Sequence, residues 1–245
     1  MKSRAVTWAG AIGAVGCVVM VLKYLPFVSV LFRHEVPCSD ETVAMYYIDY
    51  SSVGLAWTVL LGVAFLCLGR CEDSRVKCAS RAGVVACMLL ALPAIASMAF
   101  GHLTMIRFYE DLSRTANFMA LLPVVVLDYA GATFLVVAIW ELAELMPSRI
   151  RGVGYAGAVA LAVASVLMSA ASSLTGLVPC LAGLIATLCV WVDVLAFSIL
   201  CVMFVLLSRR GLEASDDLVR MPFTRKLLLS VVVFFPIAVL KYMAF

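Results

Sequence analysis

Two aspartates deep inside apolar stretches are the residues of this chain whose types and positions point to chemistry. Asp128 lies ten residues into a stretch that begins at Phe118, and Asp193 lies twelve residues into one that begins at Leu181. On helices that rise 1.5 Å per residue, both carboxyl groups would lie roughly 15 to 18 Å deep. If these stretches cross a bilayer, each carboxylate is costly there and must face a partner, a cavity or a proton pathway.

The composition indicates that these stretches do cross a bilayer. Of the 245 residues, 65% are hydrophobic and 13% are charged, and the mean hydropathy is +1.11. A soluble domain of this length needs more polar surface than that. We therefore expect an integral membrane protein of a plasma or inner membrane. The formal net charge of +3 and the lack of a Lys/Arg run predict no nucleic-acid partner.

Seven apolar segments are predicted to be membrane-spanning helices. Most reach or approach the ~20 residues that a spanning helix needs. The predicted fold is all-α: one integral membrane helical bundle over residues 1–245, with about seven transmembrane helices. The first segment is too long for the core of a signal peptide and lacks a small-residue cleavage site. The predicted spans are Ala5–Phe32, Ser52–Leu68, Ala82–Ile106, Thr115–Ile139, Val153–Ala171, Leu181–Leu207 and Leu227–Phe245.

The Lys and Arg residues are distributed unequally between the two ends of these spans. If the spans alternate in direction, 13 of the 18 fall on the amino-terminal side. Because cytoplasmic loops are enriched in Lys and Arg, we expect the amino terminus inside and the carboxyl terminus outside. The segment Arg33 to Tyr50 is then an external loop and Ser208 to Lys226 an internal one. We expect Lys23 and Lys241 to extend toward the outer headgroups.

Small residues predict where the helices approach one another closely. Spacings of three and four place such residues on one helical face, where they let a second backbone come near. The fifth predicted span carries the clearest face, and three glycines suggest the same for the first span. These residues are Gly154, Ala158, Ala162, Ser165 and Ser169 in the fifth span, and Gly10, Gly13 and Gly16 in the first.

The nine cysteines predict neither a metal site nor a redox motif. None forms a Cys-x-x-Cys pair, and neither histidine is spaced with a second ligand. Cys38 and Cys180 each follow Val-Pro on the predicted outer side. If that side is oxidising they can form a disulfide, and the alternative is two free thiols at helix ends.

Catalytic motifs are also missing from the sequence. It contains no Gly-rich phosphate loop and no serine in a nucleophile elbow. We assign no catalytic, cofactor-binding or metal-binding residue, and an enzyme is not the favoured interpretation.

A short motif in the fourth predicted span resembles the third helix of microbial rhodopsins. It has the frame R-x-x-N-F-x-x-x-x-P-x-x-x-x-D, formed by Arg114, Asn117, Phe118, Pro123 and Asp128. In that family, an arginine, a carboxylate, an aromatic residue, the proline and an inner aspartate hold these places along a proton path. The resemblance implies that Asn117 stands at the acceptor position and Asp128 at the inner donor position. Arg114 would then be an outer gate or charge partner.

The layout of seven helices with an internal amino terminus also resembles heliorhodopsins. The last helix of that family carries the lysine that binds retinal near mid-membrane. Here Phe234 or Phe235 stands at about that place, and Lys226 and Lys241 lie toward opposite ends of the helix. The chain thus departs from the family at the residue that retinal requires. We expect no covalent retinal and no other cofactor.

Three functional classes are compatible with these features. The first is a small transporter or channel-like protein whose buried acids handle protons or a small solute. The second is a non-catalytic structural or assembly subunit of a membrane complex, with partner membrane subunits or further copies of itself. An intramembrane enzyme or receptor has the least support.

Our mechanistic hypothesis concerns the two buried acids. Asp128 and Asp193 face a common interior cavity, and at least one of them changes protonation during a transport cycle. Arg114, nearer the outer end of its helix, tunes entry from that side. The simpler alternative is that each carboxyl group forms a hydrogen bond with a nearby Ser, Thr or Tyr and only fixes helix register.

Overall fold

A computed structural model describes most of the chain as long helices. It describes the backbone of residues 3–33, 40–100, 114–174, 179–212 and 221–243, and the side chains of residues 3–24, 53–95, 123, 126–167, 188–212 and 221–233. Within these ranges the chain forms seven helices and no strand. The helices are α1 (Arg4–Arg33), α2 (Asp40–Leu68), α3 (Ser74–Phe100), α5 (Arg114–Glu144), α6 (Ser148–Leu174), α7 (Pro179–Arg210) and α8 (Phe223–Met243).

Five helices are long and apolar enough to cross a membrane over their described residues. A helix suits the bilayer because it satisfies every backbone N–H and C=O within its own segment. The protein is therefore a multi-pass integral membrane helical bundle, while seven crossings and the internal amino terminus stay predictions. The five stretches are Arg4–Tyr24, Ser74–Ile95, Val126–Glu144, Ser148–Leu167 and Leu188–Arg210, and Val53–Leu68 is a shorter apolar stretch.

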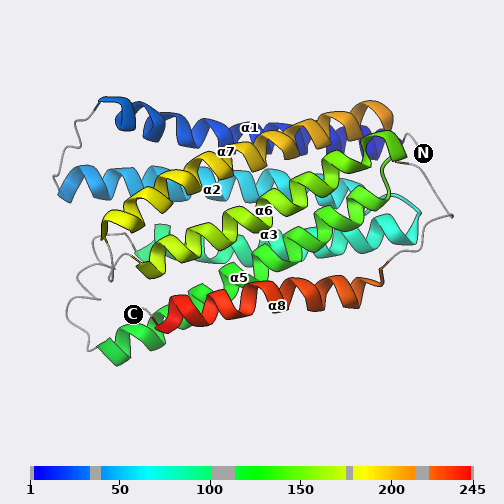
Figure 1. Ribbon diagram of the computed structural model, residues 1–245. Helices are drawn as coiled ribbons and strands as arrows, with labels where there is room; N and C mark the ends of the chain where they lie inside the picture. The colour runs from blue at the N-terminus through cyan, green and yellow to red at the C-terminus, as the bar shows by residue number, and fades with distance from the viewer. Residues whose placement is uncertain (1–2, 34–39, 101–113, 175–178, 213–220, 244–245) are drawn as a thin grey trace.

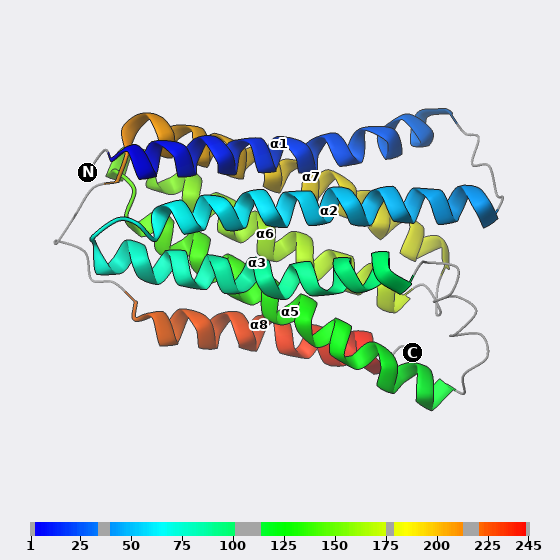
Figure 2. The ribbon, with the colours of Figure 1, turned by 180° about the vertical axis from the view of Figure 1, so that it is seen from behind.

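Six of the helices form a closed ring that follows the order of the chain (Figure 1). Helix α1 packs on α2, α2 on α3, α3 on α5, α5 on α6 and α6 on α7, and α7 returns to α1. Helix α8 lies outside this ring, against α5 and α6. Figure 2 shows the same bundle from behind, with the two ends of the chain at opposite ends of the long axis. An odd number of alternating passes produces this arrangement.

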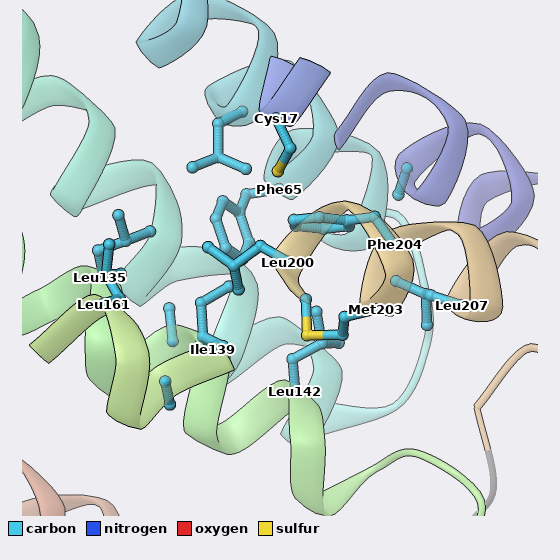
Figure 3. Close-up of a cluster of buried hydrophobic side chains, with 14 of the residues drawn as sticks. Cys17, Phe65, Leu135, Ile139, Leu142, Leu161, Leu200, Met203, Phe204 and Leu207 are labelled. Carbon is cyan, nitrogen blue, oxygen red and sulfur yellow. The ribbon is translucent and has the colours of Figure 1, made fainter. Parts of the chain in front are cut away.

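Apolar side chains fill the ring toward the end where α1 begins (Figure 3). Phe65 of α2 and Phe204 of α7 are fully buried there, together with Ile139 of α5. Because lipid tails are as apolar as these side chains, close packing rather than transfer out of water stabilises such a core. The labelled residues of the cluster are Cys17, Phe65, Leu135, Ile139, Leu142, Leu161, Leu200, Met203, Phe204 and Leu207.

The close approach predicted for the first span is confirmed between α1 and α7. A Cβ on Gly10 would lie 2.5 Å from both Phe204 O and Ser208 N, and one on Gly13 would lie 2.5 Å from the Phe204 ring. Backbone atoms cannot move aside as a flexible side chain can. The absence of a side chain at Gly10 therefore sets the distance between these two helices.

The small-residue face of the fifth predicted span also meets its neighbour. A Cβ on Gly154 of α6 would lie 2.5 Å from Ala143 Cβ of α5, and Ala158 is buried. The Ser165 hydroxyl donates to Leu161 O at 3.0 Å within its own helix. The side chain of Ser169 lies outside the described residues.

Polar residues at the helix ends explain where several helices start and stop. Ser3 Oγ accepts a hydrogen bond from Val6 N at 3.3 Å before α1, and Asp73 Oδ1 accepts one from Arg75 N at 2.8 Å before α3. Both are N-caps, which satisfy N–H groups that have no partner within the helix. Gly211 has a φ of 77° directly after α7, as is common where a helix ends.

The predicted loop boundaries need one correction. The external loop expected from Arg33 to Tyr50 is wrong for residues 40–50, because α2 already begins at Asp40. Hydropathy marks the part of a helix that lies in lipid, whereas the helix itself extends further. Asp40 and Glu41 suit the start of a helix because acids there complement the helix dipole. Helices α3, α5 and α7 likewise extend beyond their predicted spans.

Candidate functional site: a buried Lys-Tyr-Asp cluster

Asp193 forms a direct hydrogen bond with a residue of the first helix. The Tyr24 hydroxyl of α1 donates to Asp193 Oδ2 of α7 at 2.8 Å. Tyr24 is 5% exposed and Asp193 is 9% exposed. The hydrogen bond that the simpler alternative expects for Asp193 is therefore present, with Tyr24 as the donor, while the restriction of its role to helix register stays a prediction. Such a bond does not exclude a role in proton transfer.

The antiparallel register of α1 and α7 places these two side chains opposite each other. As the residue number rises along α1, the facing residue number falls along α7. The closest approaches, at Gly10 and Gly13, lie near the start of α1. They fix the register of the two helices at a distance from the hydrogen bond at Tyr24. The contacts, in order along α1, are Gly10 with Ser208, Ala14 O with Cys201 Sγ at 3.7 Å, and Tyr24 with Asp193.

Lys23 adds a positive charge to this pair. Its ammonium group interacts electrostatically with Asp193 and lies 5.7 Å from the centroid of the Tyr24 ring. It also lies 4.0 Å from the position that a Cβ on Gly54 would take, so it reaches α2. Lys23 is partly buried among α1, α2 and α7, and its extension toward the outer headgroups stays a prediction.

Trp57 of α2 carries an unsatisfied donor close to this cluster. It is 7% exposed, and its buried Nε1 has no hydrogen-bond partner among the described residues. Its ring meets that of Phe197 edge to face, with centroids 5.3 Å apart. Trp57 follows Gly54 by one helical turn, and Phe197 follows Asp193 by one turn. Buried polar groups are rarely left unpaired, so an N–H of this kind needs an explanation.

The structure does not bring Asp128 and Asp193 together at one described interface. Asp128 is partly buried on α5, which packs on α3, α6 and α8, whereas α7 packs on α1 and α6. Helix α6 therefore lies between the two acids around the ring. A cavity of about 110 Å³ lies between α5, α6 and α8, and neither acid lines it. The shared cavity predicted for Asp128 and Asp193 stays a prediction.

A second buried charge cluster was missed by the sequence reasoning. Lys226 of α8 lies 2.7 Å from Glu141 Oε1 and 2.8 Å from Glu144 Oε2, both on α5. The Lys226 side chain is 1% exposed. Trp140 Nε1 also donates to Glu144 Oε1 at 3.1 Å. This cluster attaches α8 to the outside of the ring.

The ends of both helices make this ion pair favourable. Glu141 and Glu144 lie in the last turn of α5, and Lys226 lies in the first turn of α8. Each charge is at the less favourable end of its helix dipole, so the opposite charge of the partner offsets that cost. Two acids three residues apart at one span end, and a lysine at a span end on the same side, are the signal that could have predicted it.

Other predicted site residues fall where the structure gives no side-chain description. Arg114 and Asn117 belong to α5 and Cys180 to α7, but their side chains lie outside the described residues, as do those of Phe234 and Phe235. Cys38 lies outside the described residues altogether. The gate, the disulfide and the retinal position therefore stay predictions. In the described part of the chain, no group of three His, Cys, Asp or Glu side chains could hold a metal ion.

The comparisons with known proteins assign no family to this bundle. No protein-family model, no curated protein and no solved structure matches the chain.

Proposed function

We propose that this protein is a small transporter or channel-like protein that moves protons, or a small solute coupled to protons, across its membrane. The observation that supports the proposal is the hydrogen bond between Tyr24 and Asp193, buried between two apolar helices. Ionisable residues in such segments are expensive and usually belong to a substrate or proton pathway. A bond that served only to fix register would not need an ionisable partner.

The chemistry of the cluster suits reversible protonation. Asp193 can hold a proton or release it, and the Tyr24 hydroxyl can donate to the charged form or accept from the neutral form. Lys23 balances the negative charge of the ionised form. The hydrogen bond between Tyr24 and Asp193 can therefore form in both protonation states, as a proton carrier requires.

The packing of the ring indicates which part must move. Toward the end where α1 begins, the interior is filled by side chains such as Phe65, Ile139 and Met203. The cluster lies further along α1, at residues 23 and 24, and Tyr24 packs in the same buried core. A transport cycle would have to open this layer while α1 and α7 stay in close contact at Gly10.

Asp128 and Arg114 keep their proposed roles as a second acid and an outer charge on α5. With the amino terminus inside, Arg114 stands at the outer end of α5 and Asp128 near its middle. A proton that leaves Asp193 would then have a second acceptor along the ring.

The test is proton flux in liposomes after Asp193→Asn. This change keeps the size of the side chain and removes the titratable proton, so flux should fall to the level of empty liposomes. Glu72→Gln is the matched control, because Glu72 is an exposed acid between α2 and α3. Undiminished flux in a well-folded Asp193→Asn variant contradicts the proposal.

The alternative is a non-catalytic structural or assembly subunit, which the packed interior near Phe65 favours. Purification in mild detergent separates the two functions. Stoichiometric recovery within a larger assembly, together with no proton flux from the isolated protein, selects the structural role.

A further inference from the structure

The cavity between α5, α6 and α8 combines an apolar lining with one free hydroxyl group. Its volume is about 110 Å³, and of its lining side chains only Trp140 and Ser230 carry polar atoms. Trp140 Nε1 already donates to Glu144 Oε1 at 3.1 Å. Ser230 is 7% exposed, and its hydroxyl group has no hydrogen-bond partner among the described residues. The cavity therefore presents one buried donor that lacks an acceptor.

Other serines show how such a hydroxyl group is satisfied elsewhere in this bundle. Ser165 of α6 donates to Leu161 O at 3.0 Å, and Ser198 of α7 donates to Val194 O at 2.7 Å. Both bonds run to the carbonyl four residues earlier in the same helix, as serine side chains in membrane helices often do. Ser230 forms no such bond to a described residue, and its side chain lines the cavity. An acceptor on a bound molecule would satisfy it.

The shape of the cavity favours an apolar molecule over water. A buried water needs roughly two to four polar partners, and the lining side chains provide one free hydroxyl group. An apolar cavity of about 150 Å³ can hold benzene, so this one has room for a few carbon atoms. Val159, Leu229 and Val233 line it and are exposed on the outside of the bundle. In a membrane, this open side faces lipid.

We propose that this cavity binds one phospholipid, with the carbonyl oxygen of a fatty-acyl ester as the acceptor for the Ser230 hydroxyl group. The first carbons of the acyl chain would fill the space between Ala162 and Val233, and the rest of the chain would follow the outer surface of α6 and α8. An acyl chain alone has no acceptor, whereas its ester group has one. The inference goes beyond the proposed function and does not depend on it.

The depth of Ser230 suits an ester group. Ser230 is the fourth residue of the apolar span that begins at Leu227, so it lies roughly 5 Å inside the start of that span. Ester groups of phospholipids lie at this border between the hydrocarbon and the headgroups. Trp140 lines the same cavity and its ring meets that of Tyr155 edge to face, with centroids 6.1 Å apart. Trp and Tyr are enriched at this level of the membrane.

Two arginines lie toward the headgroup of a lipid bound in this way. Helices α6 and α8 begin at the same end of the bundle (Figure 1). Arg151 lies two turns before Val159 on α6, and Arg225 lies one turn before Leu229 on α8. Lys226 is already matched by two glutamates, whereas the described ion pairs include neither arginine. Arginine binds phosphate well, so these positions favour an anionic phospholipid. With the amino terminus inside, they face the cytoplasmic leaflet, which contains anionic lipids.

The experiment titrates the full chain, stripped of lipid in mild detergent, with dioleoyl phosphatidylglycerol and counts bound lipids by native mass spectrometry. We expect one lipid to bind saturably. Ser230→Ala should weaken this binding about fivefold, the factor that one hydrogen bond contributes. The variant should fold, because the hydroxyl group has no described partner to lose. Ser198→Ala is the matched control, since Ser198 is exposed and bonds within its own helix.

A diether analogue of the same lipid tests the acceptor. It lacks the ester carbonyl, so it should bind the unmodified protein about as weakly as the diester lipid binds Ser230→Ala. Equal affinities of Ser230→Ala and Ser198→Ala for the diester lipid overturn the inference. So do equal affinities of the diester and diether lipids for the unmodified protein.

A second variant tests the cavity. Ala162→Leu adds apolar volume where the acyl chain would lie and should abolish the saturable binding. Ala156→Leu is its control, because Ala156 is exposed on the same helix and does not line the cavity. Lipid binding that survives Ala162→Leu overturns the inference. A dimer of the unmodified protein that Ala162→Leu dissociates also overturns it, because a second copy would then occupy the cavity.

Discussion

The Tyr24 hydroxyl and the Asp193 carboxyl group connect two helices across 169 residues of sequence. Both groups are polar, both are buried, and each would lose this hydrogen bond if the other were removed. A buried polar group without a partner costs more than its hydrogen bond contributes on average. At the residue scale, this mutual dependence is the most specific feature of the protein.

A double-mutant cycle measures that dependence. Tyr24→Phe removes the donor and should lower the free energy of unfolding by ~1–3 kcal/mol. Asp193→Asn should be destabilising too, because the amide is a weaker acceptor than the carboxylate. Since the two side chains share one contact, the double variant should be less destabilised than the sum, by ~0.5–3 kcal/mol. Denaturant unfolding in detergent provides the values, and strict additivity would show that the two groups do not interact.

The glycines of α1 determine how two elements fit together. Gly10 lies directly against the backbone of α7, whereas Gly152 at the start of α6 has nothing within 4 Å of its absent Cβ. Replacing glycine by alanine at both positions therefore separates two effects on stability: the helix propensity of the residue and the packing between helices.

Gly10→Ala should destabilise the bundle, since the added methyl group would force α1 and α7 apart. Overpacking of this kind costs ~1–3 kcal/mol. Gly152→Ala should be neutral or stabilising by up to ~1 kcal/mol, because alanine favours a helix more than glycine does. Thermal unfolding of both variants in one detergent tests this, and equal Tm values would mean that the α1–α7 contact is not tight.

A buried ion pair contributes to the attachment of helix α8 to the ring. Lys226→Met keeps the apolar part of the side chain and leaves Glu141 and Glu144 without their cation. Breaking a buried ion pair from one side costs ~3–5 kcal/mol. Arg225→Met is the control, because Arg225 is the exposed neighbour on the same helix.

The measurement is limited proteolysis between α7 and α8, together with the Tm. The lysine variant should be cleaved faster and melt earlier, and the arginine variant should behave as the unmodified protein does. Adding Glu141→Gln and Glu144→Gln to the Lys226→Met variant removes the two uncompensated negative charges. If this triple variant regains the Tm of the unmodified protein, those charges are the cause of the destabilisation. A Lys226→Met variant as stable as the unmodified protein would contradict the role of the cluster.

At the scale of the whole molecule, the ring in chain order implies alternating passes and places the ends of the chain on opposite sides of the bundle (Figures 1 and 2). With the amino terminus inside, Cys38 is external and the segment 213–220 is internal. In reduced, right-side-out vesicles, Cys38 should react with a membrane-impermeant maleimide. Ser215→Cys should react only after the vesicles are permeabilised. Labelling of Ser215→Cys in intact vesicles would reverse the orientation.

The sequence predicted the helices because lipid leaves the backbone few alternatives, so apolar length alone identifies a span. It predicted the contact at Gly10 because small residues permit close approach. It did not predict that α2 begins at Asp40. Hydropathy identifies apolar residues, so it does not detect the part of a helix that continues into the headgroup region. Nor did it predict that Asp193 meets Tyr24 or that Lys226 meets Glu141. Those pairs depend on which helices are neighbours around the ring. No local sequence pattern indicates which helices are neighbours.

The contact between α1 and α7 closes the ring, and it also sets an order for biosynthesis. Ribosomes add about 5–20 residues per second, so Lys23 and Tyr24 leave the ribosome roughly 8 to 34 seconds before Asp193. During this interval the two polar side chains have no partner on α7, and the glycine face of α1 has nothing to pack against. A chaperone or the insertion machinery that shields α1 would have its greatest effect in that period. Nascent chains stopped before α7 should therefore be preferred substrates for membrane quality-control proteases.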